Sequence, residues 1–179
     1  MTLRQTLRTR TDDLHEELDS LLGRFDLGHR SEYREFLITH ARVLPAVERA
    51  LEQGGIAGIL PDWDAHRRAP LLERDLAALG ETLPEPIAVA PASGTPELLG
   101  TAYVIEGSRL GSRFLAKRVG DAMPAEYLHA AGQQRAWPAL LTALDDAELA
   151  PAEVDRAVEA ARGCFALFLR AAEEVRADG

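Results

Sequence analysis

The sequence contains a single cysteine, Cys164, and fewer basic than acidic residues. One thiol cannot form a disulfide within the chain or build a cysteine-rich metal site, and so few cysteines are typical of a reducing compartment. With 20 Lys and Arg against 29 Asp and Glu, the net charge is -9. Because nucleic-acid binding depends on neutralising phosphates, this balance argues against a nucleic-acid partner. We therefore expect a cytoplasmic protein that does not bind nucleic acid.

Long apolar runs are also absent. No stretch approaches eighteen consecutive apolar residues, and the N-terminal segment 1–22 is charged throughout, so we expect neither a membrane span nor a signal peptide. Period-two runs of Val, Ile and Thr, which would indicate strands, are missing apart from a short IAVA at 87–90. The hydrophobic content of 46% over 179 residues is sufficient for one core, and we expect a single domain over 1–179.

Apolar residues recur at helical spacing along most of the chain, which predicts an all-α fold. A capping-box signal, prolines in first turns and terminal glycines mark the expected helix boundaries. The predicted helices span 2–22, 31–53 with a kink at Pro45, 70–79, 96–119, a short segment from 124, a segment around 137–144, and 151–175. The proline-rich stretch 82–96 is expected to be a surface connection and not a domain boundary.

Two glycines lie four residues apart inside the predicted helix 96–119. Gly107 and Gly111 share a face of this helix with Gly100, and each glycine costs about 1 kcal/mol relative to alanine in a helix interior. Either a closely packed helix or a flat ligand lying on the bare backbone can compensate for this cost. Helix packing is the commoner explanation, and from the glycines alone both explanations stay open.

The first helix carries the histidine with the strongest case as a ligand. Its buried stripe is predicted to contain Leu7, Leu14, Leu18, Leu21 and Phe25. His15 falls about 80° from the centre of that stripe, at the margin of the core. Asp19 follows one turn later, within reach of the imidazole, and Arg8 lies on the same side. A solvated or salt-bridged histidine is the alternative interpretation.

Two stretches of the chain together resemble the haem oxygenase family, specifically its bacterial branch that supplies bilin to phytochromes. They are LRTRTDDLHEELD at 7–19 and YVIEGSRLGSRFLAKR at 103–118, and the last helix, with ARGCFALFLRAAEEV at 161–175, is also similar. The resemblance implies an all-α helical bundle with a haem slot between the first helix and a kinked, glycine-bearing distal helix. It implies oxidative cleavage of haem to biliverdin, with release of iron and carbon monoxide, using dioxygen and an external reductant such as a ferredoxin. A bacterial phytochrome that receives biliverdin is an implied partner.

The resemblance assigns roles to residues on the first and last helices. His15 matches the histidine that binds haem iron from the proximal side, where a neutral imidazole leaves the opposite face open for dioxygen. Asp19 matches the acidic position one turn past this ligand. Phe165 is expected to form a wall of the pocket, and Arg8 is our candidate to bind a haem propionate.

The distal roles fall on the glycine-bearing helix. Gly107 and Gly111 match the glycines that let the backbone approach the porphyrin and restrict where dioxygen can point, so that the ring itself becomes the substrate. Ser108 and Ser112 are expected to anchor the water that donates a proton. Ser112 stands where many members carry a second glycine, and Ser108 stands where animal-type members carry an aspartate.

Other interpretations remain open at this stage. One is a helical module that binds haem, or regulates a partner, without turnover. Another is a dinuclear non-haem iron oxidase, because Asp12 with His15 and Glu126 with His129 have the spacing of carboxylate-x-x-His pairs. A locally basic segment is a candidate docking site for an acidic electron donor, or a solvated helix face; it comprises Arg109, Arg113, Lys117 and Arg118.

Overall fold

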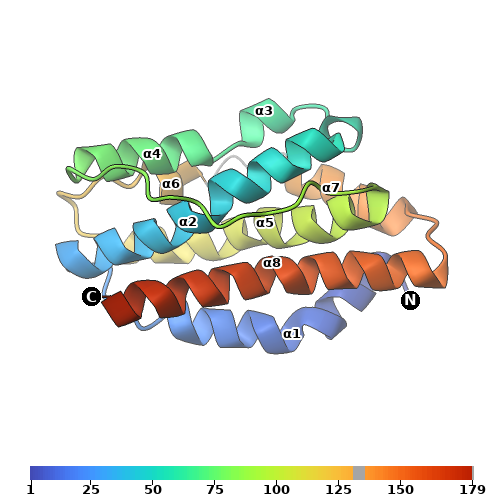
Figure 1. Cartoon of the computed structure of the whole chain (residues 1–179), viewed down its shortest axis with the longest axis horizontal. Helices are drawn as coiled ribbons and strands as arrows, with labels where there is room; N and C mark the ends of the chain where they lie inside the picture. The colour runs from blue at the N-terminus through green and yellow to red at the C-terminus, as the bar shows by residue number, and fades with distance from the viewer. Residues whose placement is uncertain (131–135, 179) are drawn as a thin grey trace.

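Helices make up most of the computed structural model, which describes residues 1–130 and 136–178 (Figure 1). In chain order the elements are α1 (Leu3–Leu22), α2 (Arg30–Gly54), the 3-10 helix η1 (Ile56–Gly58), α3 (Trp63–His66), α4 (Ala69–Ala78), α5 (Thr95–Leu115), the 3-10 helix η2 (Ala116–Arg118), α6 (Glu126–His129), α7 (Ala136–Asp146) and α8 (Pro151–Asp178). No strand occurs in these two ranges, and 87–90 is irregular. The all-α prediction is therefore confirmed.

The ends of the long helices follow the signals in the sequence. The side-chain oxygen of Thr2 accepts a hydrogen bond from Gln5 N while Thr2 N donates to Gln5 Oε1, which completes the predicted capping box of α1. The helix α2 ends at Gly55, whose φ of 89° lies in the left-handed region that glycine adopts without steric cost. The helix α5 runs unbroken through Gly107 and Gly111.

Two short helices begin where a buried carboxylate from another helix accepts their first N–H groups. Glu48 of α2 accepts from Arg68 N at 2.7 Å and from Ala69 N at 3.1 Å, at the start of α4. Asp75 of α4 does the same for the first two N–H groups of α6. Each carboxylate is 1% exposed, and burial raises the pKa of both. These long-range caps fix the positions of α4 and α6 relative to the bundle.

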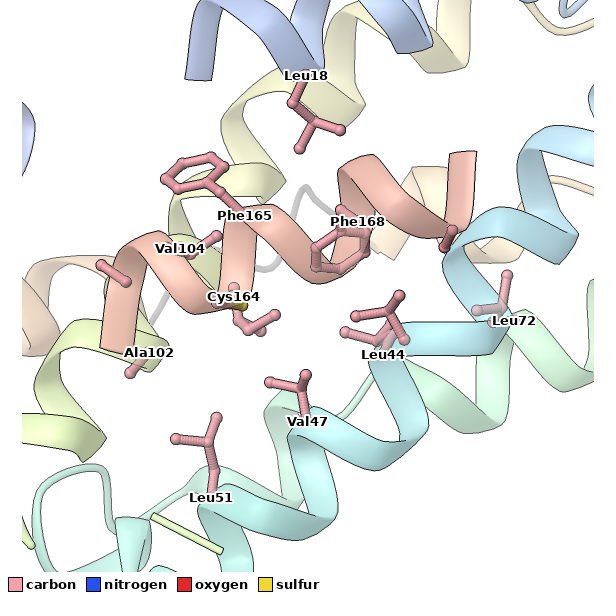
Figure 2. Packing of buried hydrophobic residues seen from close by; sticks show 14 of the residues in the cluster. Leu18, Leu44, Val47, Leu51, Leu72, Ala102, Val104, Cys164, Phe165 and Phe168 are labelled. Carbon is pink, nitrogen blue, oxygen red and sulfur yellow. The ribbon is translucent and has the colours of Figure 1, made fainter. Parts of the chain in front are cut away.

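The helix α8 lies at the centre of the fold and packs against α1, α2 and α5 (Figure 1). Figure 2 shows Phe165 of α8 directed toward α1, whereas Phe168 lies on the side of α2, where its ring is 5.6 Å from that of His40. Cys164 is 3% exposed, and burial raises the pKa of its thiol to about 12, so it is a core residue. Of the predicted stripe, Leu7, Leu18 and Phe25 are buried, and Leu14 and Leu21 are partly buried.

The connection between α4 and α5 crosses the bundle surface as an extended strap (Figure 1). Ile87 N donates to Arg42 O at 2.7 Å, and Ala92 N donates to Ala50 O at 3.4 Å. Both carbonyls belong to residues of α2. The strap is thus tied to α2 by main-chain contacts, as a surface connection.

Candidate functional site

His15 lies on the outer side of α1, where its side chain is 58% exposed. Its Nδ1 is 3.5 Å from Asp19 Oδ2, and its ring meets Phe165 of α8 edge-on with the ring centroids 5.9 Å apart. No hydrogen bond joins Nε2 to any residue of 1–130 or 136–178. The imidazole thus has a carboxylate beside one nitrogen and an open second nitrogen, at the margin of the core.

Helices α1 and α5 are connected mainly through two helices that both of them contact. Helices α1 and α5 scarcely touch each other, but each packs against α8 and against the described part of α7. Tyr103 of α5 lies close enough to Arg8 and Asp12 of α1 for their charges to act on its pKa, which burial raises. Arg8 is exposed and forms no ion pair with the described residues. The predicted propionate-binding residue therefore lies in reach of the α5 surface.

Gly107 and Gly111 leave one face of α5 without side chains. A Cβ on Gly111 would meet nothing in the described chain within 4 Å, and one on Gly107 would meet only the ring of Trp137, at an ordinary contact distance of 3.7 Å. Neither glycine is therefore required for packing against another described helix. Leu110 and Phe114 flank them with exposed fractions of 41% and 72%. Bare backbone next to exposed apolar side chains suits a flat apolar ligand.

The two serines lie one turn apart on α5 and differ in exposure. Ser108 is exposed beside Gly107, and its Oγ is 2.8 Å from Arg68 Nη2 and 2.7 Å from Ile105 O. Ser112 is 4% exposed and donates to Ser108 O at 3.1 Å. Ser108, which directly follows Gly107, is therefore exposed at the edge of the glycine face, whereas Ser112 is buried.

A buried ionic cluster lies behind α5. Arg109 is 2% exposed; its Nε donates to Glu106 Oε2 at 2.7 Å, and its Nη2 donates to His66 O. Burial lowers the pKa of Arg109, and the nearby charge of Arg68 adds to this effect. The predicted basic patch was therefore wrong in its first member, and its exposed members are Arg113, Lys117 and Arg118.

Three further residues at this site were not identified from the sequence. Trp137 of α7 lies over Gly107, and its ring centroid is 6.2 Å from that of Tyr103. Tyr103 precedes Gly107 by one turn, so the glycine spacing offered a signal for it. Trp137 and Arg68 come from other segments, and no spacing in the sequence connects them to the glycines.

The candidate site is an open surface and not an enclosed cavity. A pocket of about 380 Å³ lies behind α5, bordered by His66, Arg68 and Arg109 among others, and one of about 330 Å³ lies beneath the strap; neither includes His15 or the glycine face. In the ranges that the structure describes, no three His, Cys, Asp or Glu side chains gather around a possible metal position, so the two carboxylate-x-x-His pairs do not assemble. None of the described helices is both long and apolar enough to cross a membrane.

Comparison with known proteins agrees with this geometry. Residues 1–174 match the family model described as Heme oxygenase. The chain belongs to the haem oxygenase family. Heme oxygenase PigA of Pseudomonas aeruginosa is 27% identical over 175 residues, which cover 92% of this chain and 88% of that protein. The Heme oxygenase of Xanthomonas campestris pv. campestris is 34% identical over 99 residues, which cover 54% of this chain and 59% of that protein.

The fold also matches a solved member of this family. The NO- and CO-bound heme oxygenase from Neisseria meningitidis superposes with a TM-score of 0.83, covering 98% of this chain and 92% of that chain at 23% sequence identity. At this identity the likeness establishes the fold. The family, the enzyme class and the helical haem oxygenase fold that the sequence predicted are thereby confirmed.

Proposed function

We propose that this chain cleaves haem to biliverdin, with release of iron and carbon monoxide, using dioxygen and an external reductant. Membership of the family and the names of the relatives support this reaction. The observation that carries it is the glycine face of α5. Gly107 and Gly111 give up helix propensity without any packing contact in the described chain that requires a glycine, and a flat ligand on the backbone accounts for them.

His15 is the residue that would bind the haem iron. A neutral imidazole suits this role, and a carboxylate beside its other nitrogen, here Asp19, favours the tautomer that leaves Nε2 free to bind the metal. The edge contact with Phe165 orients the ring, because the phenylalanine is itself held in the core at 5% exposure. The residues present therefore fit haem on the α1 side.

The α5 side supplies shape and hydrogen bonding. Bound haem supplies the iron at which dioxygen is activated, and its own ring is the group that is oxidised. Gly107 and Gly111 allow the macrocycle to approach the backbone and place no acid or base side chain over it. Trp137 and Tyr103 close one end of this face, which limits the space open to a small ligand there. Ser108 holds a water at the edge of the same face.

Charged residues complete the proposed roles. Arg8 is exposed, close to the α5 surface, and matches the charge of a propionate. Arg113 and Lys117 form an exposed cationic surface on a chain with net charge -9, and we propose that they receive an acidic ferredoxin-type electron donor. The resemblance to the bacterial branch extends the proposal to a phytochrome that takes up the biliverdin.

A hemin titration tests the proposal. The wild-type protein is expected to give a sharp Soret band at about one haem per chain, and His15→Ala should abolish or broaden it. The matched control is His29→Ala, because His29 is also an exposed histidine with an aspartate close to its Nδ1, on the N-terminal side of α2. This control is expected to bind hemin like the wild type.

Turnover separates the alternatives. Adding a reductant in air should convert the haem spectrum to that of a bilin, and product analysis should identify biliverdin. Haem that stays bound and unchanged would instead indicate a haem-binding module without catalysis. Absence of a Soret band, together with two irons per chain on metal analysis, would indicate a dinuclear centre and overturn the proposal.

A further inference from the structure

Two hydrogen-bond partners determine the direction in which the hydroxyl group of Ser108 donates and accepts. Arg68 Nη2 lies 2.8 Å from Ser108 Oγ and 2.8 Å from Ile105 O. A guanidinium only donates hydrogen bonds, so Ser108 Oγ accepts from Arg68. The carbonyl oxygen of Ile105, 2.7 Å away, only accepts, so the hydroxyl hydrogen of Ser108 points to it. One lone pair of Ser108 Oγ then remains, and it is an acceptor.

Arg68 is itself buried. Its residue is 1% exposed, its backbone N donates to Glu48 Oε1 at 2.7 Å, and its guanidinium carbon lies 5.4 Å from the centre of the Tyr127 ring. No carboxylate in the described chain lies within ion-pair distance of this guanidinium. A buried arginine whose side-chain hydrogen bonds all go to Ile105 and Ser108 is aimed at this one turn of α5.

We infer that Arg68 is a positioning residue that fixes the Ser108 hydroxyl as a hydrogen-bond acceptor on the glycine face. A water that donates one hydrogen to Ser108 Oγ keeps its second hydrogen for a group lying over the glycines. Ser108 thus anchors the water without giving up its own proton, and Ser112, which is buried, takes no part. The use of this water in haem cleavage rests on the proposed function, whereas the polarity of the hydroxyl does not.

Whether these two partners hold the hydroxyl in place can be measured without haem. In protein labelled with ¹³C at serine Cβ and dissolved in equal H₂O and D₂O, a hydroxyl that exchanges slowly gives two resolved Cβ lines, one for each hydrogen isotope. Ser108 is expected to show two lines, and the exposed Ser20 of α1, which lacks such partners in the described chain, a single averaged line. In Arg68→Met the Ser108 lines should merge. A single Ser108 line in the wild type would overturn the inference.

A double-mutant cycle on the haem-loaded protein tests the function of this contact. Arg68→Met and Ser108→Ala are each expected to slow biliverdin formation about tenfold, the size of one lost hydrogen bond, with hemin affinity unchanged. Because Arg68 acts through Ser108, the double variant should be no slower than either single variant. Arg68→Lys, which can still donate, should restore part of the rate. Additive effects would show that Arg68 acts independently of Ser108.

The controls separate the two proposals. Arg67→Met removes a neighbouring arginine that is 39% exposed and bound to Glu52 at 2.7 Å, and it should change neither the Ser108 lines nor the rate. A wild type that forms no biliverdin but keeps two Ser108 lines contradicts the proposed function alone. A wild type that forms biliverdin with one averaged line contradicts the inference alone.

Discussion

The carbonyl group of Ala157 in α8 lies directly against Gly100 of α5: a Cβ on Gly100 would come within 2.0 Å of that oxygen. Here the backbones of the two helices approach so closely that only glycine fits. Two and three turns further along the same helix, Gly107 and Gly111 have free space on the corresponding face. Close helix packing therefore explains Gly100, whereas the proposed ligand on the bare backbone would account for Gly107 and Gly111.

Gly100→Ala is expected to lower the free energy of unfolding by about 2 kcal/mol. The new methyl group meets a backbone carbonyl that cannot rotate away, and this overpacking exceeds the gain of about 1 kcal/mol in helix propensity. Urea unfolding followed by circular dichroism measures the change. A variant as stable as the wild type would contradict the close approach of α5 and α8.

Gly111→Ala is expected to change stability in the opposite direction to Gly100→Ala. Gly111 lies in an unbroken helix, its φ is not positive, and its Cβ position is free, so alanine should raise the stability of the haem-free protein by about 0.5–1 kcal/mol. The same methyl group would lie on the face proposed for haem. We therefore expect slower haem cleavage and a changed distribution of biliverdin isomers, measured by chromatography of the product. Lower stability would contradict the free space at Gly111, and unchanged haem cleavage would contradict the place proposed for haem.

The sequence predicted the long helices because their boundaries depend on residues that are close along the chain. The capping box at Thr2 and the left-handed Gly55 are local signals, and both were found. The helices η1 and α3 were not predicted, since elements of three or four residues are too short to show a period.

For the candidate site too, features that depend on spacing within one helix were predicted, and contacts between distant segments were not. The place of His15 at the margin of the core and its nearness to Asp19 follow from spacing within one helix, and these were predicted. Helical geometry places Ser108 and Ser112 one turn apart on similar sides of α5, and their difference in exposure comes from the packing around the helix. The contact between Arg68 and Ser108 joins residues 40 positions apart, and the one between Trp137 and Gly107 joins different helices. Only the three-dimensional packing of α4, α5 and α7 brings these pairs together.

The buried His40 should make stability depend on pH between about 6.5 and about 4. Burial, with the charge of Arg68 adding to it, lowers the pKa of His40 to about 4 from an ordinary value of 6.5. In this range the unfolded chain binds a proton that the folded chain excludes, so stability falls as the pH falls, by up to about 3 kcal/mol. Above pH 6.5 both states are neutral and the contribution disappears.

A comparison with His40→Gln isolates this effect, because the buried Glu48 and Asp75 have raised pKa values and act in the opposite direction over the same range. The glutamine can donate to Phe36 O as the imidazole does at 2.8 Å, but it does not titrate. Urea unfolding at several pH values should show that the wild type loses more stability than the variant below pH 6.5. Parallel pH profiles would mean that His40 is protonated in the folded protein.

Glu48 should be the carboxylate on which the start of α4 depends. Glu48→Ala leaves the N–H groups of Arg68 and Ala69 without their acceptor in a buried position, and we expect a loss of about 3 kcal/mol. Glu48→Gln retains an acceptor oxygen and should cost less. The control is Glu52→Ala, one turn later on α2, whose carboxylate is 31% exposed and binds Arg67.

Amide hydrogen exchange distinguishes a lost cap from a general loss of stability. In Glu48→Ala the amides of Arg68 and Ala69 should exchange faster than the drop in global stability explains, and in Glu52→Ala they should not. Because Arg68 also holds Ser108, loosening the start of α4 should merge the two Ser108 lines even though neither partner of that hydrogen bond has been changed. If those lines stayed separate while the amides lost protection, the side chain of Arg68 would be held by Tyr127 and α5 rather than by its own backbone.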